Sequence, residues 1–284
     1  MRCTVIAVTA PTDPSPAGPA ESAPTRFNSL AYVPASGMRW GLADAATGIA
    51  LFLTVIGLFA VIATMVPALQ SDVGSLLLNL VGYGSLIGTA VVASRRSGLR
   101  RLSLDFGLAF RWVDLWWGLV IAVVAKISVY VYIVLADAIT GAEPTGGNLS
   151  LSESSIWIVV NGLVFTALVA PFAEELFMRG LLLRSVRNAI LRGWLQRRPQ
   201  PADRQTQITA VIVAIAVSSL IFMGLHMFQS TDPALLIVLG FSTLTLGVLN
   251  GIAAVRTGRL GAPIVAHVAF NASSVIGALF LGVS

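Results

Sequence analysis

The sequence predicts an all-α protein that crosses a membrane several times. Of its 284 residues, 56% are hydrophobic and only 11% are charged, whereas a soluble domain carries about 25% charged residues. The apolar residues form about seven runs of membrane-spanning length, since a helix needs about 20 apolar residues to cross a bilayer. Arginines gather in the short segments between these runs. Together these observations predict a polytopic transmembrane helix bundle of about seven spans.

The first 40 residues differ in composition from the rest of the chain. They are rich in Pro, Ala, Ser and Thr, as in TAPTDPSPAGPAESAPT, and contain the single cysteine, Cys3. No apolar segment followed by a cleavage site is present, so the pattern is not that of a signal peptide. We expect a disordered tail over residues 1–40. One cysteine also excludes an intramolecular disulfide and argues against a Cys-based metal site.

The apolar runs divide the remaining chain into two groups of helices. A first group of transmembrane helices is expected over residues 41–155, and a second group, which contains the polar residues discussed below, over residues 156–284. No sequence repeat relates the two groups, which argues against an inverted-repeat transporter. The runs lie at roughly 44–69, 73–93, 113–137, 156–183, 208–228, 233–254 and 261–282.

Arginine placement predicts the orientation. Arginines concentrate around 95–111, 184–204 and 256–259, while the alternate segments near 70–72, 138–155 and 229–232 contain neither Arg nor Lys. Under the positive-inside rule, the N-terminus is cytoplasmic and the C-terminus lies outside. The net charge of +5 therefore indicates membrane lipid, and not nucleic acid, as the partner. The Arg-rich, Lys-poor composition is typical of a GC-rich bacterial genome, so we expect a multi-pass protein of the bacterial plasma membrane.

Two adjacent carboxylates interrupt the fourth run, in LVAPFAEELFMRG. A charge at mid-membrane costs roughly 2.5–3.5 kcal/mol on insertion scales, so Glu174 and Glu175 need a function or a partner. Glu175 and Arg179 are spaced i and i+4 and are expected to pair on one helix face. Glu174 points about 100° away and is the candidate general base. A structural ion pair near the interface, with the second carboxylate snorkelling, is the alternative.

The two histidines of the sequence both lie in apolar runs. His226 occurs in SSLIFMGLHMF, one helical turn after Phe222, and His267 occurs in APIVAHVAFN, one turn before Asn271. A single intramembrane histidine often serves as a hydrogen-bond partner between helices. Two histidines, an asparagine and a spare glutamate on three helices favour convergence on one cavity.

These residues resemble the signature of the CPBP family of intramembrane proteases, which comprises CAAX proteases and bacteriocin-processing enzymes and is also called Abi. The resemblance covers residues from about 156 to 282 and implies a catalytic core there. It implies an intramembrane endopeptidase that cleaves a membrane-associated or lipidated protein or peptide. The family motifs E-E-x-x-x-R, F-x-x-x-H and H-x-x-x-N/D match, in order, Glu174-Glu175…Arg179, Phe222…His226 and His267…Asn271.

The resemblance also assigns roles to these residues. Glu174 would activate the attacking water, and His226 would hold and polarise it. His267 and Asn271 would stabilise the tetrahedral oxyanion. Glu175, which belongs to the same catalytic motif, would hold the helix that presents Glu174 through its pair with Arg179. The motif residues expected as structural support are Arg179 and Phe222.

Family members have often been described as metalloproteases, so zinc is an open question at this stage. Glu174, His226 and His267 could supply three ligands and leave a fourth position open. Glu175 would then replace Glu174 as the base. We favour a mechanism that requires no cofactor, because base, water-holding group and oxyanion donors are all present without a metal.

The candidate residues are expected at different depths in the bilayer when their positions are counted along the predicted apolar runs. Glu174 and His267 fall nearer the cytoplasmic side, where the enzyme would then act, while His226 falls near the outer end of its run. At 1.5 Å per residue the mismatch is on the order of 10 Å. Shifted boundaries of the fourth or fifth helix would remove it. Pro171, three residues before Glu174, is also expected to kink the fourth helix and to open backbone groups at the site.

The sequence also allows two other functions, and it leaves the role of one charged residue and the substrate undetermined. A transporter with a polar core predicts polar residues along a whole pathway, and a non-catalytic membrane scaffold of the same fold predicts loss of motif residues; neither pattern is present. Lys126, in the middle of the third run, is either a snorkelling side chain or a buried one, and we expect it to pair with a carboxylate or to line a polar cavity. The substrate is equally open: a prenylated C-terminus, a bacteriocin leader or a membrane-bound regulator.

Overall fold

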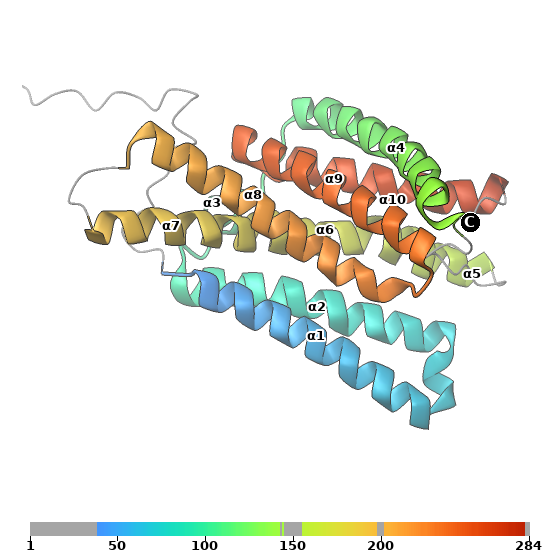
Figure 1. The fold of residues 1–284 in the computed structure, drawn as a ribbon. Helices are drawn as coiled ribbons and strands as arrows, with labels where there is room; N and C mark the ends of the chain where they lie inside the picture. Colours follow the sequence, from blue (N-terminus) through green and yellow to red (C-terminus); the bar gives the residue numbers. More distant parts are fainter. Residues whose placement is uncertain (1–38, 143, 145–154, 198–201, 282–284) are drawn as a thin grey trace, which may run out of the picture.

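The computed structural model describes residues 39–142, 144, 155–197 and 202–281. Within these ranges the chain forms helices and no strand, and seven helices are long and apolar enough to cross a membrane. This confirms the prediction of an all-α, seven-span bundle, which Figure 1 shows. The expected tail at 1–40 lies outside the described residues apart from its last two. The division of the spans into two groups at residue 155 stays a prediction.

Six of the spans are single helices, and the fourth is a succession of helical segments without a break. The single helices are α1 (Leu42–Met65), α2 (Asp72–Ser97), α4 (Trp112–Thr140), α8 (Arg204–His226), α9 (Pro233–Thr257) and α10 (Gly261–Leu281). The fourth span joins α5 (Ser155–Trp157), η3 (Ile158–Val169), α6 (Ala170–Glu175), η4 (Leu176–Leu182) and α7 (Leu183–Arg197). Short connecting helices are η2 (Pro67–Gln70), α3 (Leu102–Asp105) and η5 (Met227–Gln229).

Local sequence sets the ends of the spans through capping. The carboxylate of Asp203 accepts a hydrogen bond from a backbone N–H in the first turn of α8, and Asp232 does the same for α9. Pro233 follows at the first position of α9, where its missing N–H costs nothing. Gly141 and Gly258 end α4 and α9 with φ values of 67° and 68°, a left-handed conformation that glycine adopts without strain.

The fourth span is longer than the expected run at 156–183, because it continues as α7 to Arg197. Residues beyond 183 are too polar to belong to an apolar run, yet they keep helical hydrogen bonding outside the hydrophobic segment. Segments η3 and η4 on either side of α6 are π-helical, a rare form that is frequently found at functional sites. Glu174 therefore lies well inside a long helix and not close to the end at Arg197.

Successive spans cross the bundle in opposite directions, and the arginines lie mostly at one of its ends. Arg184 donates a hydrogen bond to the carbonyl of Gly258, and Arg192 donates one to the carbonyl of Trp40, both at 3.0 Å. These contacts join α7 to the end of α9 and to the start of α1 (Figure 1). We call this the arginine-rich end, and the opposite end, where α1 ends and α2 starts, the arginine-poor end. Which end faces the cytoplasm stays a prediction.

Candidate active site

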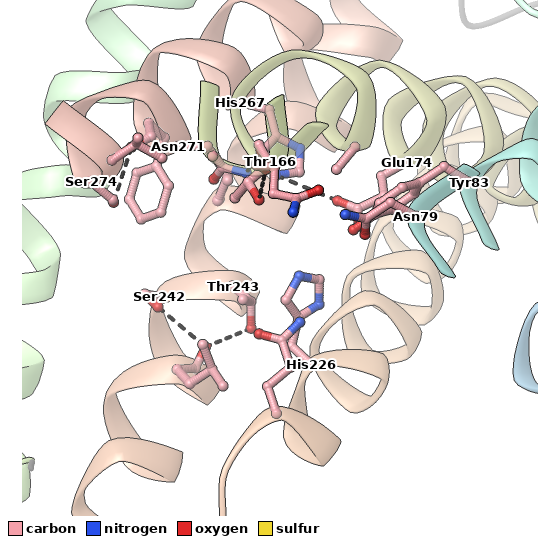
Figure 2. A pocket seen from close by; sticks show the side chains of 18 of the residues that line it. Asn79, Tyr83, Thr166, Glu174, His226, Ser242, Thr243, His267, Asn271 and Ser274 are labelled. Atoms are coloured by element: carbon pink, nitrogen blue, oxygen red, sulfur yellow. Dashed lines mark hydrogen bonds and ion pairs between the residues drawn. The ribbon is translucent and has the colours of Figure 1, made fainter. Parts of the chain in front are cut away.

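A cavity of about 380 Å³ lies inside the bundle between α2, α4, the fourth span, α8, α9 and α10. Glu174, His226, His267 and Asn271 all line this cavity. Figure 2 shows Glu174, His267 and Asn271 along one wall, and His226 on the opposite wall with Thr243. The depth mismatch counted from the sequence is therefore absent, because the fourth span extends further than its apolar run.

Glu175 is fully buried and forms the centre of a polar cluster behind the cavity wall. Its Oε1 accepts hydrogen bonds from Nη1 of Arg179 at 2.9 Å and Nδ2 of Asn250 at 3.0 Å, and lies 3.0 Å from Nδ1 of His267. The ion pair with Arg179 is the one expected from the i,i+4 spacing. Glu175 does not line the cavity, so its contacts suit a role in positioning rather than contact with substrate.

Asn250 is a member of this cluster that the sequence analysis missed. It is completely buried on α9 and also donates to the carbonyl of Pro263 at 3.2 Å. A signal was present, since an asparagine inside an apolar span is costly without a partner. Its partner could not be identified from sequence, because Glu175 lies 75 residues away.

Glu174 differs from its neighbour in both exposure and contacts. It is 8% exposed, and this exposure is to the cavity that it lines. Its Oε2 lies 3.5 Å from Nε2 of His267, and no hydrogen bond reaches Glu174 from the residues that the structure describes. Glu175 thus has three polar partners on one of its oxygens, whereas Glu174 faces the cavity.

His267 lies between the two carboxylates. With Nδ1 bonded to Glu175, its Nε2 faces Glu174 and the cavity. A carboxylate on one ring nitrogen fixes both the orientation and the tautomer of an imidazole. The ring of Phe222 packs edge-on against His267, with 5.5 Å between the ring centres, and so holds it from the other side.

His226 ends α8 and is also oriented by its own helix. Its Nδ1 lies 2.8 Å from the carbonyl of Phe222, which can only accept, so Nδ1 carries the proton. The neutral ring then presents Nε2 as an acceptor. Phe222 stacks edge-on against His226 at 4.5 Å and contacts the guanidinium of Arg179 at 4.7 Å. One aromatic ring thus separates the two histidines and covers the buried arginine.

Asn271 is held by a backbone group that Pro171 leaves free. At this point the fourth span has π-helical bonding, since the N–H of Ala170 donates to the carbonyl of Phe165, five residues back. The next bond in this register would join residue 171 to Thr166, but proline has no N–H. Nδ2 of Asn271 donates to the Thr166 carbonyl instead, at 2.9 Å. The expectation that Pro171 opens backbone groups at the site is therefore confirmed.

The three residues considered as zinc ligands do not form a ligand cluster in this arrangement. Zinc needs its protein ligands within about 2.0–2.2 Å of one point. In the described parts of the chain, no group of three or more His, Cys, Asp or Glu side chains is placed to hold a metal. His226 lies across the cavity from Glu174 and His267 (Figure 2). As they stand, these side chains do not fit a metal site.

The cavity extends from Glu174 to the arginine-poor end of the bundle. The sequence placed Glu174 near the arginine-rich end of its run, whereas the cavity beside Glu174 reaches the arginine-poor end. Lys126 on α4 also lines the cavity, so the second of its two expected environments is the one observed. The lining at the arginine-poor end comes from Asp72, Ser75, Trp157, Gln229 and Leu235.

Fold and site together define a polytopic helical membrane protein with a carboxylate and histidine cavity at its centre. Residues 155–273 match the family model described as Type II CAAX prenyl endopeptidase Rce1-like. Over these residues the chain carries a domain of the CAAX protease family, which confirms the resemblance found from the motifs. The match includes Glu174, His226, His267 and Asn271. No curated protein and no solved structure matches the chain.

Proposed function

We propose that the protein is an intramembrane endopeptidase in which Glu174 activates the attacking water. The observation that supports this proposal is the difference in environment between two adjacent carboxylates. Glu175 is surrounded by three polar partners, while Glu174 faces the cavity with no hydrogen bond from the described residues. Membership of residues 155–273 in a CAAX protease family supports the same chemistry.

The first step is the attack of water on the peptide carbonyl. Glu174 takes one proton from the water as its oxygen bonds to the carbonyl carbon, and later gives that proton to the leaving amine as the C–N bond breaks. His226 accepts a hydrogen bond from the same water through Nε2, from the opposite wall. General-base catalysis of this kind contributes roughly 10²- to 10⁴-fold.

The oxyanion would be stabilised on the wall that carries Glu174. Asn271 uses one amide N–H on Thr166 and has a second available. His267 presents Nε2 to the same wall and is the second group assigned to the oxyanion. Removing one such donor typically costs about 10²- to 10³-fold in kcat.

We further place the N-terminus in the cytoplasm of a bacterial cell, in the plasma membrane. The positive-inside rule supports this orientation. The cavity then opens on the outer side, and the substrate is a membrane-associated or lipidated protein or peptide. No cofactor is required in this scheme, because the proton transfers and charge stabilisation are assigned to side chains.

The test is cleavage of a peptide library by the purified protein in liposomes. Glu174→Gln keeps the shape of the side chain and removes the base, so we expect activity to fall by roughly 10²- to 10⁴-fold. Ser273→Ala is the matched control, since Ser273 is exposed on α10 and lies outside the cavity lining. Equal cleavage by wild type and Glu174→Gln would reject the assignment.

A further inference from the structure

A second cavity, of about 200 Å³, lies at the arginine-rich end of the bundle between α3, η4, α7 and the end of α9. Among the described residues, it shares no lining residue with the cavity that contains Glu174. Leu104 on α3 is exposed and belongs to its rim, while Arg179 on η4 is fully buried and lies at its inner end. A water needs about 10–15 Å³ of such space, so a small polyatomic ion and several waters fit.

The side chains that line this second cavity are biased in charge. Arg179, Arg184 and Arg187 contribute three guanidinium groups, and within the described parts of the chain no Asp or Glu belongs to the lining. The buried carboxylate of Glu175 balances the first of these charges. A concave surface lined by charge of one sign concentrates ions of the opposite sign, so this lining favours an anion.

The protein holds two of these arginines in defined positions. Nη2 of Arg184 donates to the carbonyl of Gly258 at 3.0 Å. Nε and Nη2 of Arg187, which is only 4% exposed, donate to Oδ1 of Asn188 at 3.4 and 3.2 Å. Gly107 has a φ of 71°, and a Cβ there would overlap with Nη2 of Arg184, so glycine admits this guanidinium to its place. Donors that are already oriented lose less entropy when a ligand binds.

Arg179 adds an observation that itself indicates a ligand. Its Nη1 donates to Glu175, but Nε and Nη2 are buried and have no hydrogen-bond partner among the described residues. Buried N–H groups are almost always bonded to protein, ordered water or an ion. Nε and Nη2 form one edge of the guanidinium, the arrangement that binds two oxygens of a phosphate or carboxylate.

We propose that the second cavity binds a phosphoryl group, supplied by the headgroup of an anionic phospholipid or by free phosphate. A tetrahedral phosphoryl group presents oxygens in several directions, so it can contact Arg184 and Arg187 on α7 while it faces Arg179 at the inner end. The arginine-rich ends of the spans are also where the phosphates of a lipid leaflet lie. The assignment goes beyond the proposed peptidase chemistry and does not depend on it, because the two cavities are lined by different residues.

Equilibrium binding to the purified full-length protein in uncharged detergent micelles tests the site. The probes are inorganic phosphate and a short-chain phosphatidic acid, and the corresponding diacylglycerol is the control without phosphate. At constant ionic strength, we expect one equivalent of a phosphate-bearing probe to bind and to raise the melting temperature, and the diacylglycerol to do neither. Binding of inorganic phosphate identifies free phosphate as a ligand, and binding of the lipid alone identifies a headgroup; both support the proposal. Failure of both probes to bind overturns it.

Three variants that each lower the net charge by one separate this cavity from a general attraction of anions. Arg184→Gln removes a guanidinium from the lining, and Ser103→Glu places a carboxylate on its exposed rim, where the packed interior is not disturbed. Arg256→Gln is the matched control, because Arg256 is exposed on the last turn of α9 and lies outside the lining.

We expect Kd to rise roughly ten- to hundredfold in Arg184→Gln and Ser103→Glu, the range for a hydrogen bond to a charged group. In Arg256→Gln we expect Kd to stay within about twofold of wild type, because an exposed charge outside the cavity is screened. Ser103→Glu decides the question if Arg184→Gln does not fold. Wild-type Kd values in the two lining variants, or equal weakening in all three variants, overturn the proposal.

Discussion

Replacement of Arg179 tests whether Glu175 is held as a buried charge. Arg179 and Glu175 are both fully buried, with 2.9 Å between Nη1 and Oε1. Arg179→Met leaves the carboxylate with Asn250 and His267 but without a cation of fixed charge. Breaking a buried pair by removing one partner costs roughly 3–5 kcal/mol. We expect a loss of about that size in the free energy of unfolding.

The assay is unfolding in mixed micelles, followed by a spectroscopic signal, for single and double variants. Glu175→Gln/Arg179→Met should recover about half of the loss, because the double variant leaves no uncompensated charge. Arg259→Met is the comparison. Its ion pair with Asp114 is shorter, at 2.6 Å, but one-fifth exposed on the arginine side, and Asp114 keeps a hydrogen bond from the backbone N–H of Arg111, so we expect a smaller loss than for Arg179→Met. An Arg179→Met protein as stable as wild type, or no more affected than Arg259→Met, would refute the reasoning.

Three further predictions concern the cavity. Pro171→Ala restores the missing backbone N–H, which then competes with Asn271 for the carbonyl of Thr166. We expect kcat to fall several-fold while thermal stability is maintained. An unchanged kcat would contradict this. Extensive dialysis against a chelator, checked by metal analysis of the protein, should leave peptide cleavage unchanged, and recovery of lost activity by added zinc would show the mechanism to be incomplete. Ser75→Cys should react with a membrane-impermeant maleimide added outside intact cells and Arg101→Cys only after lysis, whereas the reverse pattern would invert the proposed orientation.

Features determined by local sequence could be predicted, while those determined by packing could not. The seven runs and the Glu175–Arg179 pair depend on hydropathy and on a spacing of four residues, and the structure contains both. The hydrogen bond from Lys126 to Ser274 joins residues 148 positions apart, and no periodicity contains that information. The continuation of the fourth span to Arg197 could not be predicted from hydropathy, because polar residues end an apolar run without ending a helix. Catalytic roles, orientation and cofactor requirement stay predictions.

Three helices are held together by contacts to one oxygen atom, Oε1 of Glu175, and this affects how they respond to the membrane. Oε1 of Glu175 joins the fourth span to α9 through Asn250 and to α10 through His267. A bilayer that is too thin or too thick tilts the helices within it, at a cost of fractions of a kcal/mol per Å of mismatch. A tilt of α9 or α10 relative to the fourth span would break a hydrogen bond to a buried charge, which is worth more than that. The histidine that faces Glu174 therefore keeps its alignment across membranes of different thickness, until the three helices separate together.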